Sequence, residues 1–253
     1  MPRRCFSPQA PNGLPLPSNI LTPYTPTRQT MNMKTLRLLP LSLLGLLALG
    51  ACSHGSNEFT AEGTISDAAG KTLYLETTDT DIPQLVDSVT LDDKGHFSFH
   101  GEGHSYPAFY RLRIGETFIP FAADSLTHLT LSASAKDLFS TYKIESGDEA
   151  NKQIREIGQL RATTDKAVEG VLSALSAGTL ERSVALARID SLSTQLKNTL
   201  TSKYIYSNPK GAAAYFALFQ SYRGGTSFAL DAPGEDRAFA AVATDYAAFP
   251  PTA

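Results

Sequence analysis

Cys52 is the residue whose neighbours predict chemistry most clearly. It follows Leu49-Gly50-Ala51 at the end of a 14-residue apolar run, Leu38 to Ala51, with Lys34 and Arg37 just upstream. As a helix this run would measure about 21 Å, which is short for a bilayer core of about 30 Å. A basic start, a short apolar stretch and small residues at its end are typical of a cleaved signal peptide. The pattern predicts export and cleavage before Cys52, which leaves its thiol at the new N-terminus.

The order Leu49-Gly50-Ala51-Cys52 resembles the lipobox of bacterial lipoproteins. The resemblance implies that Cys52 carries lipid, including palmitate, and that this lipid attaches the protein to the membrane. One acyl chain holds a protein only marginally, so the several chains of this family imply a stable anchor. Ser53 replaces the aspartate that retains some lipoproteins in the inner membrane, which favours the outer membrane, on its periplasmic or surface face. The alternative is an ordinary secretory signal that contains a cysteine by chance.

The residues before the apolar run do not resemble any folded element. Residues 1–30 contain seven prolines without a periodic apolar face, and proline at this density disfavours both helix and sheet. Met31 and Met33 stand directly before Lys34, where a signal peptide should start. We therefore expect residues 1–30 to be a misassigned or disordered extension, 31–51 a signal peptide and 52–56 a tether.

The net charge argues against two classes of partner, nucleic acid and anionic lipid surfaces. All 25 acidic residues follow Cys52, whereas five of the 22 basic residues precede it, so residues 52–253 carry 17 basic and 25 acidic side chains and a net charge of −8. Nucleic acid selects basic surfaces and so does anionic lipid. Cys52 is also the last cysteine of the chain, which leaves the folded body no disulfide, thiolate metal site or Cys-x-x-Cys pair.

Residues 57–145 have the pattern of short strands. Phe59, Ala61, Gly63 and Ile65 alternate with polar residues, which predicts a half-buried strand. Residues 86–91 and 96–100 flank Asp92-Asp93-Lys94-Gly95 and predict a hairpin with Phe97 and Phe99 inward. About seven such strands predict an antiparallel β-sandwich or a partly open barrel. With the helices that follow, the fold class is α+β.

Two groups in this region could be mistaken for sites. Gly70-Lys71-Thr72 looks like the end of a phosphate-binding loop, but Ile65 occupies the position of its first glycine and a strand pattern follows. His96, His100 and His104 suggest a metal cluster. The first two would lie about 13 Å apart on one strand, and zinc needs three or four converging ligands, so a solvated face is favoured. We expect no metal and no cofactor.

Nucleophile and carboxylate patterns are equally incomplete. Ser66 and Ser146 lack the Gly-x-Ser-x-Gly elbow of hydrolases. Asp92 and Asp93 are adjacent, and neighbouring side chains diverge. We therefore predict no catalytic residue in this chain.

Residues 148–249 have helical spacing. Apolar residues recur at three and four positions from Ile154 to Leu175 and again from Leu186 to Leu200. Gly178 is expected to end the first helix and Thr179 to cap the second. Asn208-Pro209 should break the chain before a helix over 212–222, and residues 236–248 predict a last one. Residues 250–253 read as the start of a linker.

The order of these parts resembles the N-terminal domain of unknown function in Gram-negative lipoproteins of the thiol-disulfide interchange type. The quoted motifs are Gly63-Thr64-Ile65-Ser66-Asp67, Lys94-Gly95-His96-Phe97-Ser98-Phe99, Ile144-Glu145-Ser146-Gly147, Asn208-Pro209 and Ala214-Tyr215-Phe216-Ala217-Leu218. In that family a thioredoxin-like domain of the AhpC/TSA and TlpA-like kind follows and carries Cys-x-x-Cys. This sequence stops at Ala253 without it, so no catalytic residue is carried over.

Two functions remain open, and a hydrolase is disfavoured because no set of groups converges. The first is a non-catalytic, membrane-tethered module of a thiol-disulfide oxidoreductase, truncated or stand-alone, that positions or binds a thioredoxin-like domain or another envelope protein. The second is a cell-envelope lipoprotein that binds a glycan or a peptide through Tyr106, Phe109 or Phe118, although the chain has no Trp for stacking on sugars. A reading frame that continues past codon 253 into Cys-x-x-Cys would favour the first.

Overall fold

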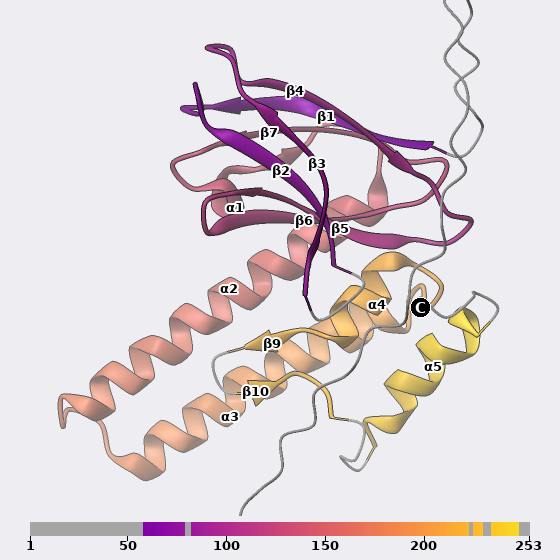
Figure 1. Cartoon of the computed structure of the whole chain (residues 1–253). Coiled ribbons are helices and arrows are strands. Elements are labelled where there is room, and N and C mark those ends of the chain that lie inside the picture. Colours follow the sequence, from indigo (N-terminus) through magenta and orange to yellow (C-terminus); the bar gives the residue numbers. More distant parts are fainter. Residues whose placement is uncertain (1–57, 79–81, 223–224, 230–233, 248–253) are drawn as a thin grey trace, which may run out of the picture. The chain divides into compact units, whose positions relative to one another are not determined.

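The computed structural model describes residues 58–78, 82–222, 225–229 and 234–247. They belong to one compact unit, residues 52–253, in which strands come first and helices follow (Figure 1). The predicted α+β class is confirmed. Cys52 and its lipobox, residues 1–51, the tether and residues 250–253 lie outside the described residues. Of the helices described, none is both long and apolar enough to cross a membrane.

Two four-stranded sheets face each other across a shared core, and both remain open. The first has the order β4 (His96–Glu102), β1 (Glu58–Ser66), β7 (His128–Ser134), β8 (Lys143–Ile144). The second has the order β3 (Gln84–Thr90), β2 (Thr72–Thr77), β5 (Ala108–Ile114), β6 (Thr117–Ala123). All neighbours are antiparallel except β1 and β7, which run parallel. The first sheet therefore departs from the purely antiparallel pattern that we expected.

The hairpin predicted across residues 86–100 is wrong. β3 pairs with β2 in one sheet and β4 pairs with β1 in the other, so the turn Asp92–Gly95 crosses between the sheets. Alternation and a glycine turn do not distinguish a hairpin from such a crossing, because both leave the apolar side chains facing the core. Gly95 is needed in the crossing: its φ is +70°, and a Cβ there would lie 1.9 Å from the carbonyl oxygen of Ile65.

The core of the sandwich is built from the inward positions of each strand. Phe97 and Phe99 are 5% and 1% exposed, as the alternation predicted. Phe59 lies at the centre, with its ring centroid 4.6 Å from that of Tyr110 and 6.1 Å from that of Phe121. Gly101 faces Phe59, and a Cβ there would come within 2.2 Å of the ring. Close packing of this kind leaves little freedom to enlarge a side chain.

The helices come in the order α1 (Leu138–Thr141), α2 (Glu149–Ser176), α3 (Arg182–Thr199), the π-helix η1 (Leu200–Ile205), α4 (Ala212–Leu218) and α5 (Asp236–Tyr246), with the short strands β9 (Ser221–Tyr222) and β10 (Gly225–Thr226) before α5. The helices after α1 pack on one another and α2 also contacts β6, whereas α1 contacts β6 and β7 and adds Leu138 to the sandwich core. α2 and α3 form the expected helical hairpin (Figure 1). The helix predicted over 212–222 stops at Leu218, and its last residues form β9 instead.

The ends of α2 follow local chemistry, whereas the start of α3 does not. Asp148 caps α2, since its carboxylate accepts a hydrogen bond from the Asn151 backbone N–H at 2.9 Å. Gly178 ends the helix with a φ of +69°. Thr179 does not cap α3, which begins at Arg182; its hydroxyl donates back to the Ala174 carbonyl instead.

The apolar stripe of α3 is buried only toward its C-terminal end. Leu196 and Leu200 are 2% and 0% exposed, but Leu186 is 56% exposed. Helical spacing alone therefore does not show which apolar residues of α3 are buried.

The side chain of Asn151 joins the helices to the sandwich. Its Oδ1 accepts from the Ala122 N–H and its Nδ2 donates to the Ala122 carbonyl, both at 2.8 Å. Nδ2 also donates to Asp148 at 2.6 Å. The amide thus pairs with the free edge of β6 as the backbone of another strand would, and it is 2% exposed.

Candidate functional site

A groove of about 460 Å³ lies between β6 and the helices. Four phenylalanine side chains dominate its wall, and they come from β6, α1 and the α4 region. The lining residues are Glu116, Thr117, Phe118, Pro120, Phe139, Gly158, Arg161, Phe216, Phe219, Gln220 and Ser221. A concave, largely aromatic surface with a few polar groups is typical of a binding site.

Local structure explains how the wall is formed. In β6 the alternate residues Ile119 and Phe121 are fully buried in the sandwich, so Phe118 and Pro120 face outward. In α2, Gly158 allows the helix to approach Phe139, because a Cβ would lie 2.9 Å from the end of that ring. The sequence folds a strand and a helix against each other and leaves their aromatic neighbours at the surface.

Two of the phenylalanines are open to solvent. Phe118 is 41% exposed and Phe219 is 59% exposed. Phe219 is held by its neighbours, with ring centroids 4.8 Å from Tyr215 and 6.2 Å from Phe239. Exposed aromatic side chains fixed in a groove are the groups that dominate binding energy at protein interfaces.

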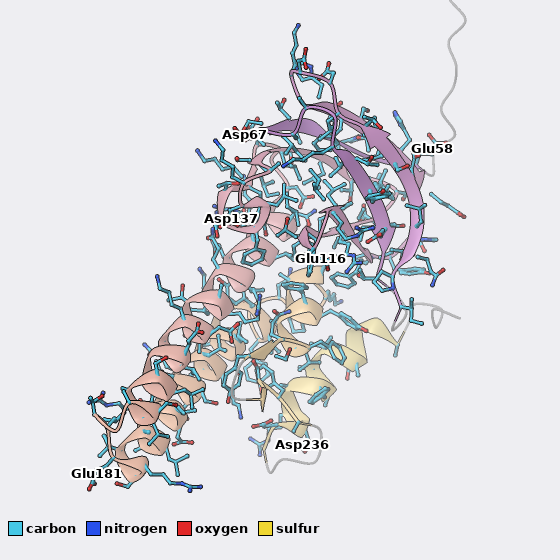
Figure 2. The ribbon with its side chains drawn as sticks, turned by 60° about the vertical axis from the view of Figure 1, so that its left-hand side comes forward. Glu58, Asp67, Glu116, Asp137, Glu181 and Asp236 are labelled. Atoms are coloured by element: carbon cyan, nitrogen blue, oxygen red, sulfur yellow. The ribbon has the colours of Figure 1, made fainter. Side chains whose placement is uncertain are left out.

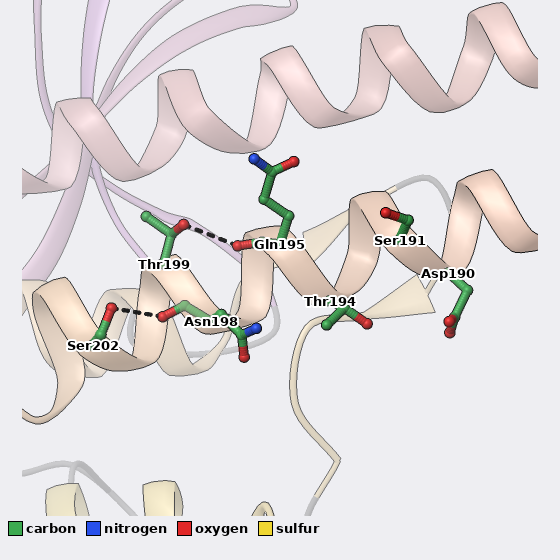
Figure 3. Close-up of a pocket in the computed structure, with 7 residues that line it drawn as sticks. All are labelled: Asp190, Ser191, Thr194, Gln195, Asn198, Thr199 and Ser202. Carbon is green, nitrogen blue, oxygen red and sulfur yellow. Dashed lines mark hydrogen bonds between the residues drawn. The ribbon is translucent and has the colours of Figure 1, made fainter.

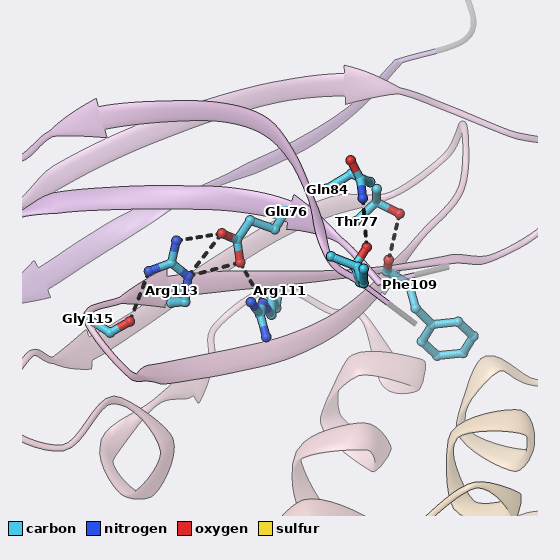
Figure 4. A network of polar contacts seen from close by, with 8 residues as sticks. Glu76, Thr77, Gln84, Phe109, Arg111, Arg113 and Gly115 are labelled. Carbon is cyan, nitrogen blue, oxygen red and sulfur yellow. Dashed lines mark hydrogen bonds and ion pairs between the residues drawn. The ribbon is translucent and has the colours of Figure 1, made fainter. Parts of the chain in front are cut away.

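A network of charged side chains adjoins the groove on the outer face of the second sheet (Figure 4). Arg111 Nε donates to Glu76 at 2.6 Å, and Arg113 Nη2 donates to the other oxygen of Glu76 at 2.6 Å. The Arg111 guanidinium lies 5.2 Å from the Phe118 ring centroid, and that of Arg113 lies 4.5 Å from the Tyr74 ring centroid. The arginines therefore extend the aromatic wall into a row across β2, β5 and β6.

The network has a fixed charge state. Hydrogen bonds from Arg113 and Arg111 outweigh the effect of burial and hold the pKa of Glu76 below its ordinary value. The same contact raises the pKa of Arg113. A carboxylate that stays ionised and bound to two guanidinium groups is not available for proton transfer near neutral pH. The network can orient a ligand, and it does not supply an acid or a base.

A second hollow, of about 630 Å³, follows the polar face of α3 (Figure 3). Its lining residues are Asp190, Ser191, Thr194, Gln195, Asn198, Thr199 and Ser202. The hydroxyls of Thr199 and Ser202 donate to the carbonyls of Gln195 and Asn198 in their own helix. Asp190 is the only ionisable side chain in this lining. Its lining contains no aromatic side chain, unlike that of the groove beside β6.

Of the three aromatic residues predicted to bind a ligand, one, Phe118, faces the groove. Phe109 stacks on Tyr215, with ring centroids 5.3 Å apart, and belongs to the core between sheet and helices. Tyr106 stacks on His104 at 5.1 Å, away from the residues that line the groove.

Three groove residues were missed from the sequence: Phe139, Phe216 and Phe219. The spacing of residues 215–219 predicted a compact apolar helix but did not indicate which side chains stay exposed. Nothing in the sequence connects Phe216 and Phe219 with β6, which lies more than ninety residues earlier. The sequence carries no signal that separates these three phenylalanines from core residues.

The remaining sequence candidates do not form a site. β2 begins at Thr72, so a strand follows Gly70-Lys71-Thr72, as predicted. His96 and His100 lie on the exposed face of β4. Among the described residues no three His, Cys, Asp or Glu side chains are placed to hold a metal ion.

The carboxylate of Asp92 supports a turn. Its Oδ1 accepts from the backbone N–H of Lys94 at 2.9 Å and of His96 at 3.3 Å. Burial acts to raise the pKa of Asp92, but backbone hydrogen bonds from His96, Lys94 and Gly95 outweigh it and lower the pKa. The Ser146 hydroxyl is buried and makes no hydrogen bond within the described part of the chain, so no base there activates it.

Comparison with known sequences matches one segment of the chain. Residues 59–153 match the model of a family described as a domain of unknown function, DUF4369. The match runs from β1 into the first turn of α2 and so includes Asn151 and its contact with β6. No curated protein matches the chain. The matched segment is thus similar to an uncharacterised domain, and the groove is formed partly by helices beyond it.

Proposed function

We propose that this chain is a lipid-anchored protein of the cell envelope whose folded body is a non-catalytic binding module. It acts as the N-terminal module of a thiol-disulfide oxidoreductase and docks or positions a thioredoxin-like domain. The observation that carries the binding role is the aromatic groove, in which Phe118 and Phe219 are 41% and 59% exposed. The lipobox, Leu49 to Cys52, supports the anchor, and the match of residues 59–153 to an uncharacterised domain is consistent with the module.

The anchor is tested in cells. Cys52→Ser removes the sulfur that would carry lipid, so we expect loss of palmitate labelling and release of the protein from the membrane fraction. Cys5→Ser is the matched control, because residue 5 precedes the cleavage site and should not affect either measurement. Retention of the Cys52→Ser protein in membranes with unchanged labelling would contradict the proposal.

The groove is tested by titration with a purified TlpA-like thioredoxin domain. Phe219→Ser removes an exposed aromatic anchor, and we expect affinity to fall by about tenfold or more. Leu186→Ser is the control, since Leu186 is equally open, at 56%, but lies on α3 and not in the groove. The docking role is refuted if the wild-type chain does not bind, or if both variants bind like the wild type.

A peptide ligand is the second candidate, and the edge of β6 favours it. The N–H and C=O of Ala122 both bond to the Asn151 side chain, so at this position the backbone of β6 points away from β5. Phe118 has the same parity, four residues earlier, which directs its backbone N–H and C=O away from β5 at the free edge of the sheet. An extended peptide could pair there and place a side chain among the phenylalanines. Aromatic tripeptides that shift the Phe118 amide resonance, with no effect of the thioredoxin-like domain, would favour this alternative.

A further inference from the structure

The topology gathers one set of loops at the end of the sandwich where the folded chain begins. β1 starts at Glu58, β4 ends beside it and β7 starts beside it. β5 and β3 also begin at this end, and β2 and β6 finish there, because they are antiparallel to β5. Residues 82 and 83 and the connections at residues 103–107 and 124–127 therefore share this end with Glu58, and we name it the tether end. Figure 2 shows Glu58 and Asp67 at opposite ends of β1.

The tether limits the distance from this end to a lipid on Cys52. Six residue steps separate Cys52 from Glu58. A fully extended chain spans at most about 3.3–3.6 Å per residue, so the six steps reach about 20 Å. Whatever path the tether takes, an anchor on Cys52 keeps the tether end within about 20 Å of the lipid and leaves the opposite end free to lie farther away.

The tether end carries exposed aliphatic side chains at its tips. Leu126 is 81% exposed and Ile82 is 72% exposed, the two highest values among the large apolar side chains of the described residues. Leu126 is held in place: its N–H donates to Asp124 Oδ1 at 2.9 Å, and the next carbonyl, of Thr127, accepts from Thr60 N–H of β1 at 3.0 Å. The backbone of the loop is thus fixed, and covering the Leu126 side chain with an apolar surface would be favourable.

The opposite end of the sandwich is built differently. Its turns present exposed charged residues, namely Asp67, Lys71, Asp92, Asp93, Lys94, Glu116, Lys136 and Asp137. The buried apolar residues of these turns, Ala68 and Leu91, belong to the core. The two most exposed aliphatic side chains among the described residues thus lie at the end where the tether joins.

From these observations we propose that Leu126 and Ile82 contact the bilayer that holds the lipid on Cys52, so that the sandwich stands on its tether end. The inference rests on the proposed lipid anchor. Glu58 and Glu102 are cross-strand neighbours at this end, and two carboxylates disfavour an anionic surface. The surface that fits is therefore a zwitterionic bilayer, with the two aliphatic tips at the level of its headgroups.

The experiment places a fluorescent probe at each end of the lipidated mature protein. Leu126→Cys is labelled with an environment-sensitive dye, which is specific because lipid occupies the sulfur of Cys52. Lys94→Cys, at the opposite end, is the matched control. In phosphatidylcholine vesicles with brominated acyl chains, we expect blue-shifted and quenched emission from position 126 and unchanged emission from position 94. Emission from position 126 that stays characteristic of water, or quenching at position 94 instead, overturns the inference.

A second measurement separates this inference from the anchor itself. A single acyl chain coupled chemically to Cys52 of unlipidated protein gives only marginal binding, so small contributions are measurable. We expect Leu126→Ser to lower partition into phosphatidylcholine vesicles by about tenfold, and Leu186→Ser to change it by less than about twofold. If Cys52 carries no lipid in cells, the proposed anchor is contradicted. If the two variants partition equally into the vesicles, contact of Leu126 with the bilayer is contradicted.

Discussion

Replacing Asn151 by alanine removes the contact that joins the helices to the sandwich. The wild-type amide satisfies both the N–H and the C=O of Ala122 at 2.8 Å, and the two residues are 2% and 4% exposed. In Asn151→Ala these two backbone groups stay buried without a partner. Each such group costs about 1–3 kcal/mol, and alanine regains a few tenths through helix propensity. We expect a net loss of about 3 kcal/mol.

The assay is urea denaturation, followed by circular dichroism and by tyrosine fluorescence. For a body of this size the loss corresponds to a fall in Tm of roughly 6–12 °C. Asn198→Ala, on the exposed polar face of α3, is the control and should change the free energy of unfolding by less than about 0.5 kcal/mol. If Asn151→Ala unfolds within about 0.5 kcal/mol of the wild type, the amide does not hold the two parts together and the reasoning fails.

Asn151→Asp tests the same contact through the pH dependence of stability. The introduced carboxyl would be buried, and the wild-type amide already lies 2.6 Å from Asp148. Burial and the neighbouring carboxylate both raise its folded pKa above the unfolded value. The folded variant then binds a proton that the unfolded chain releases, so its stability is highest at low pH and falls as pH rises through the raised pKa. A variant whose stability relative to wild type does not depend on pH would contradict this.

Three further substitutions, one of them with Gly170→Ala as its control, test the packing and the charge network. Glu76→Gln should lower stability by about 2 kcal/mol at neutral pH. Because the pKa of Glu76 is lowered in the folded protein, the stability that its carboxylate contributes is lost only as pH falls below about 4.5. Variant and wild type should therefore have the same free energy of unfolding in urea titrations at acid pH. Tyr142→Phe removes a buried hydroxyl that has no hydrogen-bond partner among the described residues, and calorimetry should show an unchanged Tm or a gain worth up to about 1 kcal/mol; a clear loss would reveal a partner. Gly101→Ala should cost about 1–3 kcal/mol because its Cβ meets the Phe59 ring, while Gly170→Ala, with open space around it, should gain up to about 1 kcal/mol; equal effects would contradict the packing.

The features predicted well from the sequence are those set by neighbouring residues. Asp148 and Gly178 bound α2 because capping needs only an oxygen or a permissive φ within a few residues. Phe97 and Phe99 face inward because alternation fixes the side of a strand. The α+β class could be predicted because strand alternation in the first part of the chain is followed by helical spacing in the second part.

The features that were not predicted correctly depend on contacts between residues far apart in the sequence. The parallel pairing of β1 with β7 and the crossing at Asp92–Gly95 are choices of partner, and alternation is the same for every choice. The groove is a stronger case: Phe118 lies outside the sandwich, and only the approach of α2 at Gly158 and of α4 makes a wall around it. Leu186 belongs to a regular apolar stripe and is nevertheless exposed, because a stripe is buried only where another element packs against it.

Mass spectrometry of the N-terminal peptide, after purification from the membrane fraction, tests the central claim most directly. The account predicts a peptide that begins at Cys52 and carries the mass of several acyl chains on that residue. A mature chain that begins elsewhere, or one that begins at Cys52 with a free thiol, would contradict it.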